Sequence, residues 1–471
     1  MFQFTSIEQY QADLHSGRTT CEQAVRHFLS HIDELSSLNA FVEVFTEESI
    51  ARAVELDRSG RKGKLHGVIV GIKDNICYEG HKVSAGSGIL QNFTSLYSAT
   101  AVERLLAEGA IIIGRQNCDE FGMGSTNENS FYGATKNPLD AGRVPGGSSG
   151  GSAAAVKAGL CMAALGSDTG GSVRLPADFC GLVGLKPSYG RVSRHGLIAY
   201  ASSFDVIGVL ANSIADASIV LEVISGPDEF DSTNIGQKPE SATTDTTSNK
   251  KYRIAYFPEW INHSSIDPEI AAAIQKKLAQ LKEEGHTVEP VTFTLTDYIV
   301  PTYYILTTAE ASSNLSRYDG IRYGQNWHEE SQTVAKFYQQ NRKNGFGGEV
   351  KRRIMLGTFV LSAGYYDAYY TKAQQVRRLL QRQTDLIFKD FDFILAPNAP
   401  SVAYRIGEKN TDKLAMYMGD IFTVFANLTG VPASSLPVFK HSSNLPFGLQ
   451  VLSSPQNEVC LQRFSHHLMQ Q

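Results

Sequence analysis

The chain has 471 residues, of which 42% are hydrophobic and 19% are charged; this composition is typical of a soluble globular protein and excludes a disordered or fibrous one. Its net charge of −5 disfavours a stand-alone basic nucleic-acid binder. Because no apolar run approaches a membrane span and the first residues lack the pattern of a signal peptide, we expect no membrane association and a cytoplasmic protein.

The N-terminal region, residues 1–60, is predicted to be helical. Thr20 and Gln23 have the spacing of a capping box, which satisfies backbone groups at the start of a helix. Apolar residues then recur every three or four positions, as on the buried face of an amphipathic helix: Ala24, Val25, Phe28, Leu29, Ile32 and Leu35. This pattern indicates packing and carries no functional signal.

Strand and helix patterns alternate after residue 65. Residues 66–75 (HGVIVGIKDN) are a short apolar run with a polar end, residues 98–109 (SATAVERLLAEG) have a helical pattern closed by a glycine, and residues 110–115 (AIIIGR) are a second apolar run. A strand, a helix and a second strand form the unit of a parallel or mixed α/β sheet.

Residues 227–250 are polar and aperiodic, so they are predicted to be a surface loop. The α/β pattern then resumes with a strand at 251–257, a helix after Asp267 as its N-cap, and a buried strand at 391–400. We therefore expect one large α/β domain over residues 1–471.

Cysteine and histidine patterns give no metal signal. The six cysteines are scattered singly and form no C-x-x-C pair, which predicts neither a disulfide framework nor a zinc site. The twelve histidines form no H-E-x-x-H motif, and the adjacent His466 and His467 are predicted to lie in a polar C-terminal tail. We expect no metal in this chain.

Glycines are concentrated in residues 142–190, which hold twelve of the 41 in the chain. Without Cβ atoms, such a segment can bring consecutive N–H groups against a ligand. The phosphate-loop spacing G-x-x-x-x-G-K-[ST] is absent. G-x-S-x-G occurs at 146–150 and 147–151, but the preceding residues contain two prolines and lack the buried strand of a nucleophile elbow. A flexible linker is also disfavoured, because residues 151–159 (GSAAAVKAG) favour a helix.

Several segments resemble the amidase signature family, and its three core motifs are GIKDNI at 71–76, GGSSGGS at 146–152 and LGSDTGGSVRLPADFCGLVGLKP at 165–187. Within that family, the chain is most similar to the glutamine-hydrolysing A subunits of tRNA-dependent amidotransferases, through residues 118–133, 190–205, 349–370 and 427–437. The resemblance implies an α/β fold, a single large domain whose mixed sheet is flanked by helices on both faces.

The resemblance implies a Ser-Ser-Lys catalytic triad, with Ser172 as nucleophile, Ser148 as a bridging serine in a cis peptide and Lys73 as the base. A serine hydroxyl is a weak nucleophile until a base takes its proton, and these motifs contain no histidine. A lysine can be that base when burial lowers its pKa and leaves it neutral. Taken singly, Lys73 could instead be a strand-end lysine paired with Asp74, and the serines could be ordinary turn residues.

Two supporting roles follow from the same resemblance. Ser149, adjacent to the bridging serine, is expected to be a supporting hydrogen-bonding residue. The backbone N–H groups of Thr169, Gly170, Gly171 and Ser172 are expected to form the oxyanion hole, which stabilises charge on the transition state.

The resemblance further implies glutamine as the substrate. Arg353 is expected to hold its α-carboxylate, which suits the bidentate geometry of arginine, and Asp420 its α-ammonium. Tyr304 is expected to line the same pocket. Without the resemblance, Arg353 could equally be a solvated member of the basic run at 351–353.

In the assembly that the resemblance implies, this chain supplies ammonia to a B subunit, which uses ATP and Mg²⁺ and makes most contacts with tRNA. A C subunit serves as a brace. This chain itself is expected to need no cofactor. Two alternatives stay open. One is a free-standing amidase for small amides, which has no use for the amino-acid contacts of Arg353 and Asp420. The other is a non-catalytic scaffold of the same fold.

Overall fold

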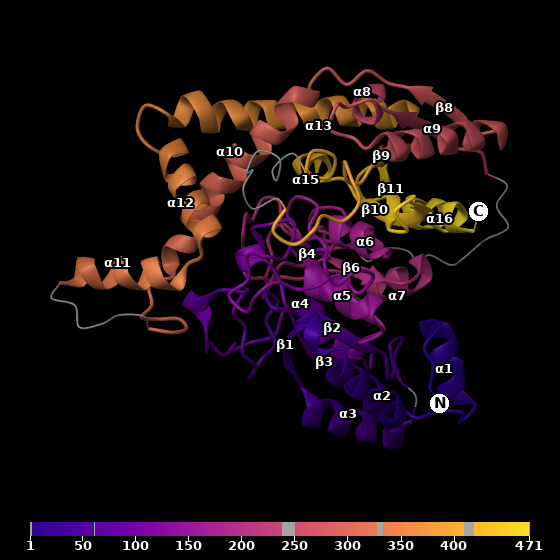
Figure 1. Cartoon of the computed structure of the whole chain (residues 1–471), viewed down its shortest axis with the longest axis vertical. Helices are drawn as coiled ribbons and strands as arrows, with labels where there is room; N and C mark the ends of the chain where they lie inside the picture. Colours follow the sequence, from indigo (N-terminus) through magenta and orange to yellow (C-terminus); the bar gives the residue numbers. More distant parts are fainter. Residues whose placement is uncertain (1, 61, 238–249, 327–332, 409–418, 471) are drawn as a thin grey trace.

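The described residues form a mixed sheet of eleven strands (Figure 1). The structure is a computed structural model, and it describes residues 2–60, 62–237, 250–326, 333–408 and 419–470. The strand order is β1-β3-β2-β4-β6-β5-β10-β11-β9-β7-β8. The strands are β1 (Phe41–Val44), β2 (Ile69–Lys73), β3 (Ile111–Gln116), β4 (Ala163–Asp168), β5 (Val183–Lys186), β6 (Val206–Ala211), β7 (Arg253–Tyr256), β8 (Thr287–Pro290), β9 (Phe393–Pro397), β10 (Ala433–Lys440) and β11 (Pro446–Ser453).

The sheet combines two parallel groups with antiparallel strands between them. Strand β2 runs parallel to β3 and β4, and β7 runs parallel to β8 and β9. The other pairs are antiparallel. The strand, helix and strand predicted over 66–115 are β2, α4 and β3, and the predicted mixed sheet is confirmed.

Helices cover both faces of the sheet. Along β9, the alternate residues Phe393 and Leu395 join one core cluster, whereas Ile394 and Ala396 join the other. The first cluster includes residues of α2, α9 and α16, and the second includes residues of α10, α13 and α15. The helices are α1 (Ile7–His15), α2 (Cys21–Glu34), α3 (Thr46–Ser59), α4 (Thr100–Ala107), α5 (Gly150–Lys157), α6 (Arg174–Cys180), α7 (Ile214–Ile224), α8 (Pro258–Ile261), α9 (Pro268–Glu283), α10 (Thr296–Asn314), α11 (Val334–Gly345), α12 (Gly348–Val360), α13 (Lys372–Asp390), α15 (Val424–Thr429) and α16 (Glu458–Met469).

The sheet is assembled from two consecutive parts of the chain. Strands β1 to β6 come from residues 41–211 and occupy one side, and strands β7 to β11 come from residues 253–453 and occupy the other. The two parts meet where β5 pairs with β10, for example at Leu185 and Ser434. In Figure 1, α2 and α3 lie at one end of the molecule and α10 and α13 at the other.

The predicted N-terminal helices are present, but two other predictions need correction. Thr20 caps α2, and its hydroxyl accepts the N–H of Gln23 at 3.1 Å. The N-terminal region also contains β1, a four-residue edge strand that is too short to stand out from the helical pattern around it. His466 and His467 lie in helix α16 and not in an irregular tail.

The predicted surface loop at 227–250 lies partly outside the described residues, which stop at 237 and resume at 250. No helix in the described part of the chain has the length and apolar character needed to cross a bilayer.

Candidate active site

Lys73 ends β2, an interior strand of the sheet that pairs with β3 and β4. Its side chain is fully buried, and its Nζ lies 2.7 Å from Ser148 Oγ and 2.8 Å from Ser167 Oγ. Burial lowers the pKa of Lys73 from its ordinary value. The interpretation of this residue as a strand-end lysine paired with Asp74 is wrong, because Asp74 pairs with Arg115. A buried lysine that contacts serine hydroxyls has the environment required of a neutral base.

Ser148 lies just before α5, and the peptide bond between Gly147 and Ser148 is cis. The N–H of Asp119 donates to the Ser148 carbonyl at 3.1 Å, which holds this turn against the segment after β3. A Cβ at position 147 would collide with the Asp119 carboxylate, so only glycine fits there. No sequence pattern indicated that Asp119 contacts Gly147 and Ser148, because these contacts join separate segments of the chain.

Ser172 lies in the turn between β4 and α6. Its carbonyl accepts the N–H of Ser149 at 3.1 Å, which joins the two serine motifs through the backbone. Ser149 also hydrogen-bonds to the backbone of Ser167, whose hydroxyl contacts Lys73. Within the described residues, the Ser172 hydroxyl makes no hydrogen bond, and this residue is 8% exposed. The structure thus brings all three residues together and leaves the hydroxyl of Ser172 available to a substrate.

The glycine turn before Ser172 leaves fewer N–H groups available to an oxyanion than the four that the sequence predicts. The N–H of Gly171 donates to Asp168 Oδ1 at 2.9 Å, so we remove Gly171 from the set of oxyanion donors. Among the described residues, no hydrogen bond engages the N–H groups of Thr169, Gly170 or Ser172. Gly171 has φ +125°, a backbone conformation that favours glycine.

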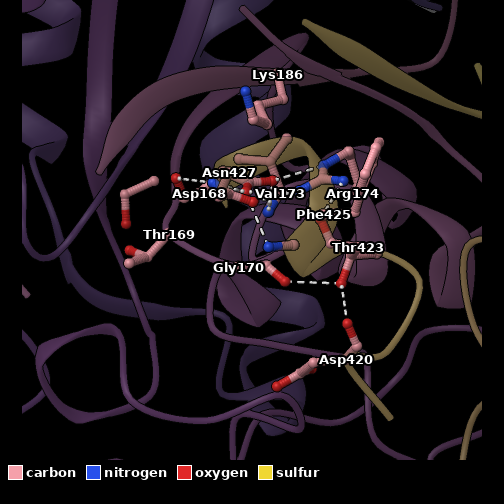
Figure 2. Close-up of polar contacts among 12 residues, drawn as sticks. Asp168, Thr169, Gly170, Val173, Arg174, Lys186, Asp420, Thr423, Phe425 and Asn427 are labelled. Atoms are coloured by element: carbon pink, nitrogen blue, oxygen red, sulfur yellow. Dashed lines mark hydrogen bonds and ion pairs between the residues drawn. The ribbon is translucent and has the colours of Figure 1, made fainter. Parts of the chain in front are cut away.

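A buried ion pair between Asp168 and Arg174 holds this glycine turn in place (Figure 2). Arg174 Nη2 lies 3.0 Å from Asp168 Oδ1, and neither side chain is exposed. Burial alone raises the pKa of Asp168, but the Arg174 charge outweighs it and lowers that pKa to about 2. Arg174 also donates to the Thr423 carbonyl and to Asn427 Oδ1 in the C-terminal part of the chain. Both members of the pair stand in the glycine motif, but nothing in the spacing indicated that they pair.

Arg353 points inward from α12. It is 4% exposed, its Nε donates to Glu349 Oε1 at 2.9 Å, and its Nη1 donates to the Tyr200 hydroxyl at 2.7 Å. Its guanidinium lies 5.4 Å from the centre of the Tyr304 ring. The interpretation of Arg353 as a solvated member of a basic run is therefore wrong. Tyr200 was missed by the sequence analysis, since it lies in a distant segment that has no charge pattern.

Asp420 is linked to Arg353 through Tyr304. The Tyr304 hydroxyl donates to Asp420 Oδ2 at 2.9 Å, so Tyr304 contacts both charged residues. Burial raises the pKa of Asp420 to about 7. The Asp420 carbonyl accepts the N–H groups of Thr423 and Val424 at 3.1 Å, at the start of α15. The predicted substrate residues are thus brought together, with opposite charges near the glycine turn.

The described residues include one group with possible metal-ligand atoms, formed by Glu284, His286 and His467. His286 Nδ1 accepts the N–H of Tyr252 at 3.1 Å, so the proton of the neutral ring is on Nε2. A ring in that tautomer has no lone pair to offer a metal at Nε2. We therefore assign no metal to this group.

Comparisons with known proteins give one consistent family. A model of the amidase family matches residues 23–461. The chain is 48% identical over 471 residues to the A subunit of the glutamyl-tRNA(Gln) amidotransferase of Chlorobium limicola, and the match covers 99% of each chain.

Solved structures share this fold. The crystal structure of the A subunit of glutamyl-tRNA(Gln) amidotransferase from Thermotoga maritima has 39% identity and a TM-score of 0.79, with 98% of this chain and 93% of that chain covered. The peptide amidase of Stenotrophomonas maltophilia has 27% identity and a TM-score of 0.81, with 99% and 96% covered.

Proposed function

Because the chain belongs to the amidase family, we propose that it is the glutamine-hydrolysing subunit of a tRNA-dependent amidotransferase. In that assembly it supplies ammonia for amide formation on Glu-tRNA(Gln), Asp-tRNA(Asn) or both. Relatives that match over nearly the full chain bear the name of such a subunit. The observation that carries the proposal is that a buried Arg353 and a half-buried Asp420 both contact Tyr304, and that the Asp420 turn also contacts the glycine turn before Ser172.

The serine-lysine centre can carry out acyl transfer. Ser172 attacks the side-chain carbonyl of glutamine while Ser148 takes its proton and passes one to neutral Lys73. The N–H groups of Thr169, Gly170 and Ser172 stabilise the oxyanion. The proton returns through Ser148 to the leaving nitrogen, which releases ammonia and leaves a glutamyl ester on Ser172. Water then attacks the ester by the same proton route and releases glutamate.

The charged residues select the amino-acid end of the substrate. Arg353 is held by Glu349 and Tyr200 and faces the α-carboxylate. Asp420 faces the α-ammonium, and Tyr304 fixes one of its carboxylate oxygens. Because the guanidinium and the carboxylate carry opposite charges, the site favours a zwitterion whose carboxylate and ammonium can pair with Arg353 and Asp420. A free-standing amidase for small amides does not need this pair, and for that reason we favour glutamine.

The assembly follows from this assignment. A B subunit uses ATP and Mg²⁺ to activate the tRNA-linked carboxyl group and makes most contacts with tRNA, and a C subunit braces the complex. We expect this chain to need no cofactor of its own, and its net charge of −5 agrees with tRNA contacts made mainly elsewhere. The cytoplasmic location stays a prediction.

Ammonia release tests the proposal. The full chain is assayed alone and with candidate B and C subunits, tRNA and ATP, with either glutamine or butyramide as the amide. We expect glutamine hydrolysis that rises in the complex, and little hydrolysis of butyramide. Equal turnover of both amides with no effect of partners supports the free-standing amidase instead.

Arg353 provides the matched variants for this test. Arg353→Met removes the positive charge that is proposed to bind the α-carboxylate of glutamine. Loss of one partner in a buried charged contact costs about 2–5 kcal/mol, so kcat/KM for glutamine should fall at least roughly 30-fold. Hydrolysis of butyramide, which lacks the carboxylate, should change less than about twofold. Arg378→Met is the control, because Arg378 is exposed on helix α13 and its hydrogen bond is to Gln381 on the same helix.

A further inference from the structure

The peptide unit that joins Gly170 to Gly171 is held at both of its ends. Its N–H, from Gly171, donates to Asp168 Oδ1 at 2.9 Å, and its carbonyl, from Gly170, accepts the Thr423 hydroxyl at 2.7 Å. Because a peptide unit is planar, two such bonds fix its orientation. The N–H groups on either side of it, from Gly170 and Ser172, are two of the proposed oxyanion donors.

The two ends of this peptide unit are held by different kinds of partner. Asp168 belongs to the ion pair with Arg174, in which both side chains are fully buried. Thr423 instead belongs to the segment that carries Asp420, and its N–H and hydroxyl lie 3.1 and 3.2 Å from the Asp420 carbonyl. Figure 2 shows the resulting chain of contacts from Gly170 through Thr423 to Asp420.

Thr423 packs against the glycine turn without free space. The residue is fully buried, and a Cβ at Gly171 would collide with its side chain. The Arg174 guanidinium donates to the Thr423 carbonyl at 2.9 Å. A displacement of the 420–423 turn is therefore transmitted to the Gly170 carbonyl, because tightly packed groups cannot move independently.

We propose that Thr423 is a positioning residue, which couples the binding of the substrate ammonium at Asp420 to the orientation of the Gly170–Gly171 peptide. The inference rests on the proposed glutaminase function. In this account the α-ammonium of glutamine raises kcat as well as affinity, since binding energy from a remote substrate group is used to align the oxyanion donors. The hydroxyl of Thr423 is the part of the residue that transmits the effect.

The test compares glutamine with glutaramate, which is glutamine without its α-amino group. Wild-type chain, assembled with its partner subunits, should hydrolyse glutaramate with a higher KM and a kcat roughly tenfold lower. Thr423→Val removes the hydroxyl at almost constant volume. It should lower kcat for glutamine roughly tenfold, change kcat for glutaramate less than about twofold, and so abolish the difference between the two substrates. Thr423→Ser keeps the hydroxyl and should restore the difference.

Thr429→Val is the matched control. The Thr429 hydroxyl donates to the Phe425 carbonyl at 2.8 Å within the same helix, and it does not contact the glycine turn. This variant should leave kcat for both substrates within about twofold of wild type. Thermal unfolding of each variant checks the fold, and Thr423→Ala replaces Thr423→Val under the same criteria if the latter does not fold.

Two results overturn the coupling. An equal loss of kcat for both substrates in Thr423→Val shows a merely structural role, and a rise in KM alone shows a binding role. A different result overturns the proposed function: wild-type chain that hydrolyses glutamine and glutaramate equally well has no ammonium site at Asp420, and the coupling then fails with it. Kinetics of the wild-type chain with the two substrates are enough to identify that outcome, without any variant.

Discussion

At the scale of single residues, burial decides which side chains can do chemistry in this site. Lys73 is surrounded by protein, and burial lowers its pKa, whereas the same physical effect raises the pKa of Asp420 to about 7. Desolvation disfavours the charged form of each group, so it makes a base of the lysine and a weak acid of the aspartate.

The Asp420 shift predicts how glutamine binding depends on pH. The carboxylate form, which pairs with the α-ammonium, is present above pH 7 and is lost as the pH falls through about 7. KM for glutamine should therefore rise on acidification, by roughly tenfold between pH 8 and pH 6. Steady-state kinetics from pH 5.5 to 8 measure this. Asp420→Asn should give a high KM with no such dependence, and a flat wild-type KM over the range contradicts the assignment.

Lys73 gives a prediction about the chemical step. Lys73→Met should lower kcat roughly 10²- to 10⁴-fold, the usual contribution of a general base. Lys73→Arg should not restore it, because a guanidinium stays protonated. Chemical denaturation should show no loss of stability in Lys73→Met, since an apolar side chain of similar volume is tolerated in a buried site. Lys277→Met, on helix α9, is the control and should retain kcat within about twofold.

A Lys73→Met variant that keeps more than a tenth of wild-type kcat would falsify its role as base. Such a result points to another proton acceptor for Ser148, and it leaves the position of Ser148 unchanged.

The sequence could predict residues that carry a motif but not those that act through contacts. Lys73, Ser148 and Ser172 stand in recognisable motifs, and the structure places them side by side. Asp119 and Tyr200 lie in segments that carry the resemblance, but no pattern in those segments, or around Thr423, indicated the contacts of these residues. Their positions follow from how distant segments pack, and a hydrogen bond between residues 253 positions apart, such as the one from Thr423 to Gly170, leaves no periodicity to detect. Gly171 was predicted as an oxyanion donor because the sequence does not reveal that Asp168 uses its N–H.

At the scale of elements, prediction succeeded where a pattern was long or closed by a clear signal. The strand β2, the helix α4 and the parallel strand β3 follow from apolar periodicity and a terminal glycine. The edge strand β1 is only four residues long, and all of its residues are half-buried. Helix α16 did have a signal, because Leu461, Phe464 and Leu468 recur at helical spacing and are buried. Its polar face concealed that pattern.

The glycine turn and helices α6 and α15 form one unit through Arg174, and this gives a prediction about stability. Arg174→Met leaves the Asp168 carboxylate buried and without its ion-pair partner, so the free energy of unfolding should fall by about 3–5 kcal/mol. Arg26→Met, which breaks an exposed pair with Glu22 on helix α2, should cost less than about 0.5 kcal/mol. Urea denaturation measures both. A loss below about 1 kcal/mol in Arg174→Met contradicts the view that this pair holds the turn.

At the scale of the whole molecule, the site is built across the junction of two halves of the sheet. The proposed triad residues come from the part of the chain that forms β1 to β6, and Arg353, Asp420 and Thr423 come from the part that forms β7 to β11. The halves are joined by the pairing of β5 with β10 and by the hydrogen bonds of Arg174. The proposed nucleophile and the proposed substrate contacts therefore lie on different halves of the sheet.

This division predicts that neither half is active alone. Residues 1–237 and residues 250–471, produced separately, should show no glutamine hydrolysis, since one lacks the substrate residues and the other lacks the triad. Co-expressed, they should associate through β5 and β10 and recover glutaminase activity. Co-purification and ammonia release measure this outcome. Full activity of residues 1–237 alone contradicts the placement of the substrate site.

The central claim is that Ser172 hydrolyses glutamine to feed amide formation elsewhere in an assembly. The direct measurement is tRNA amidation by the complex that contains Ser172→Ala, with glutamine or with ammonium chloride as the nitrogen source. We predict that the variant loses glutamine-dependent amidation to background, because the nucleophile is absent, and that it keeps ammonium-dependent amidation at the wild-type rate. Undiminished amidation with glutamine contradicts the account, since it shows that ammonia is released without Ser172.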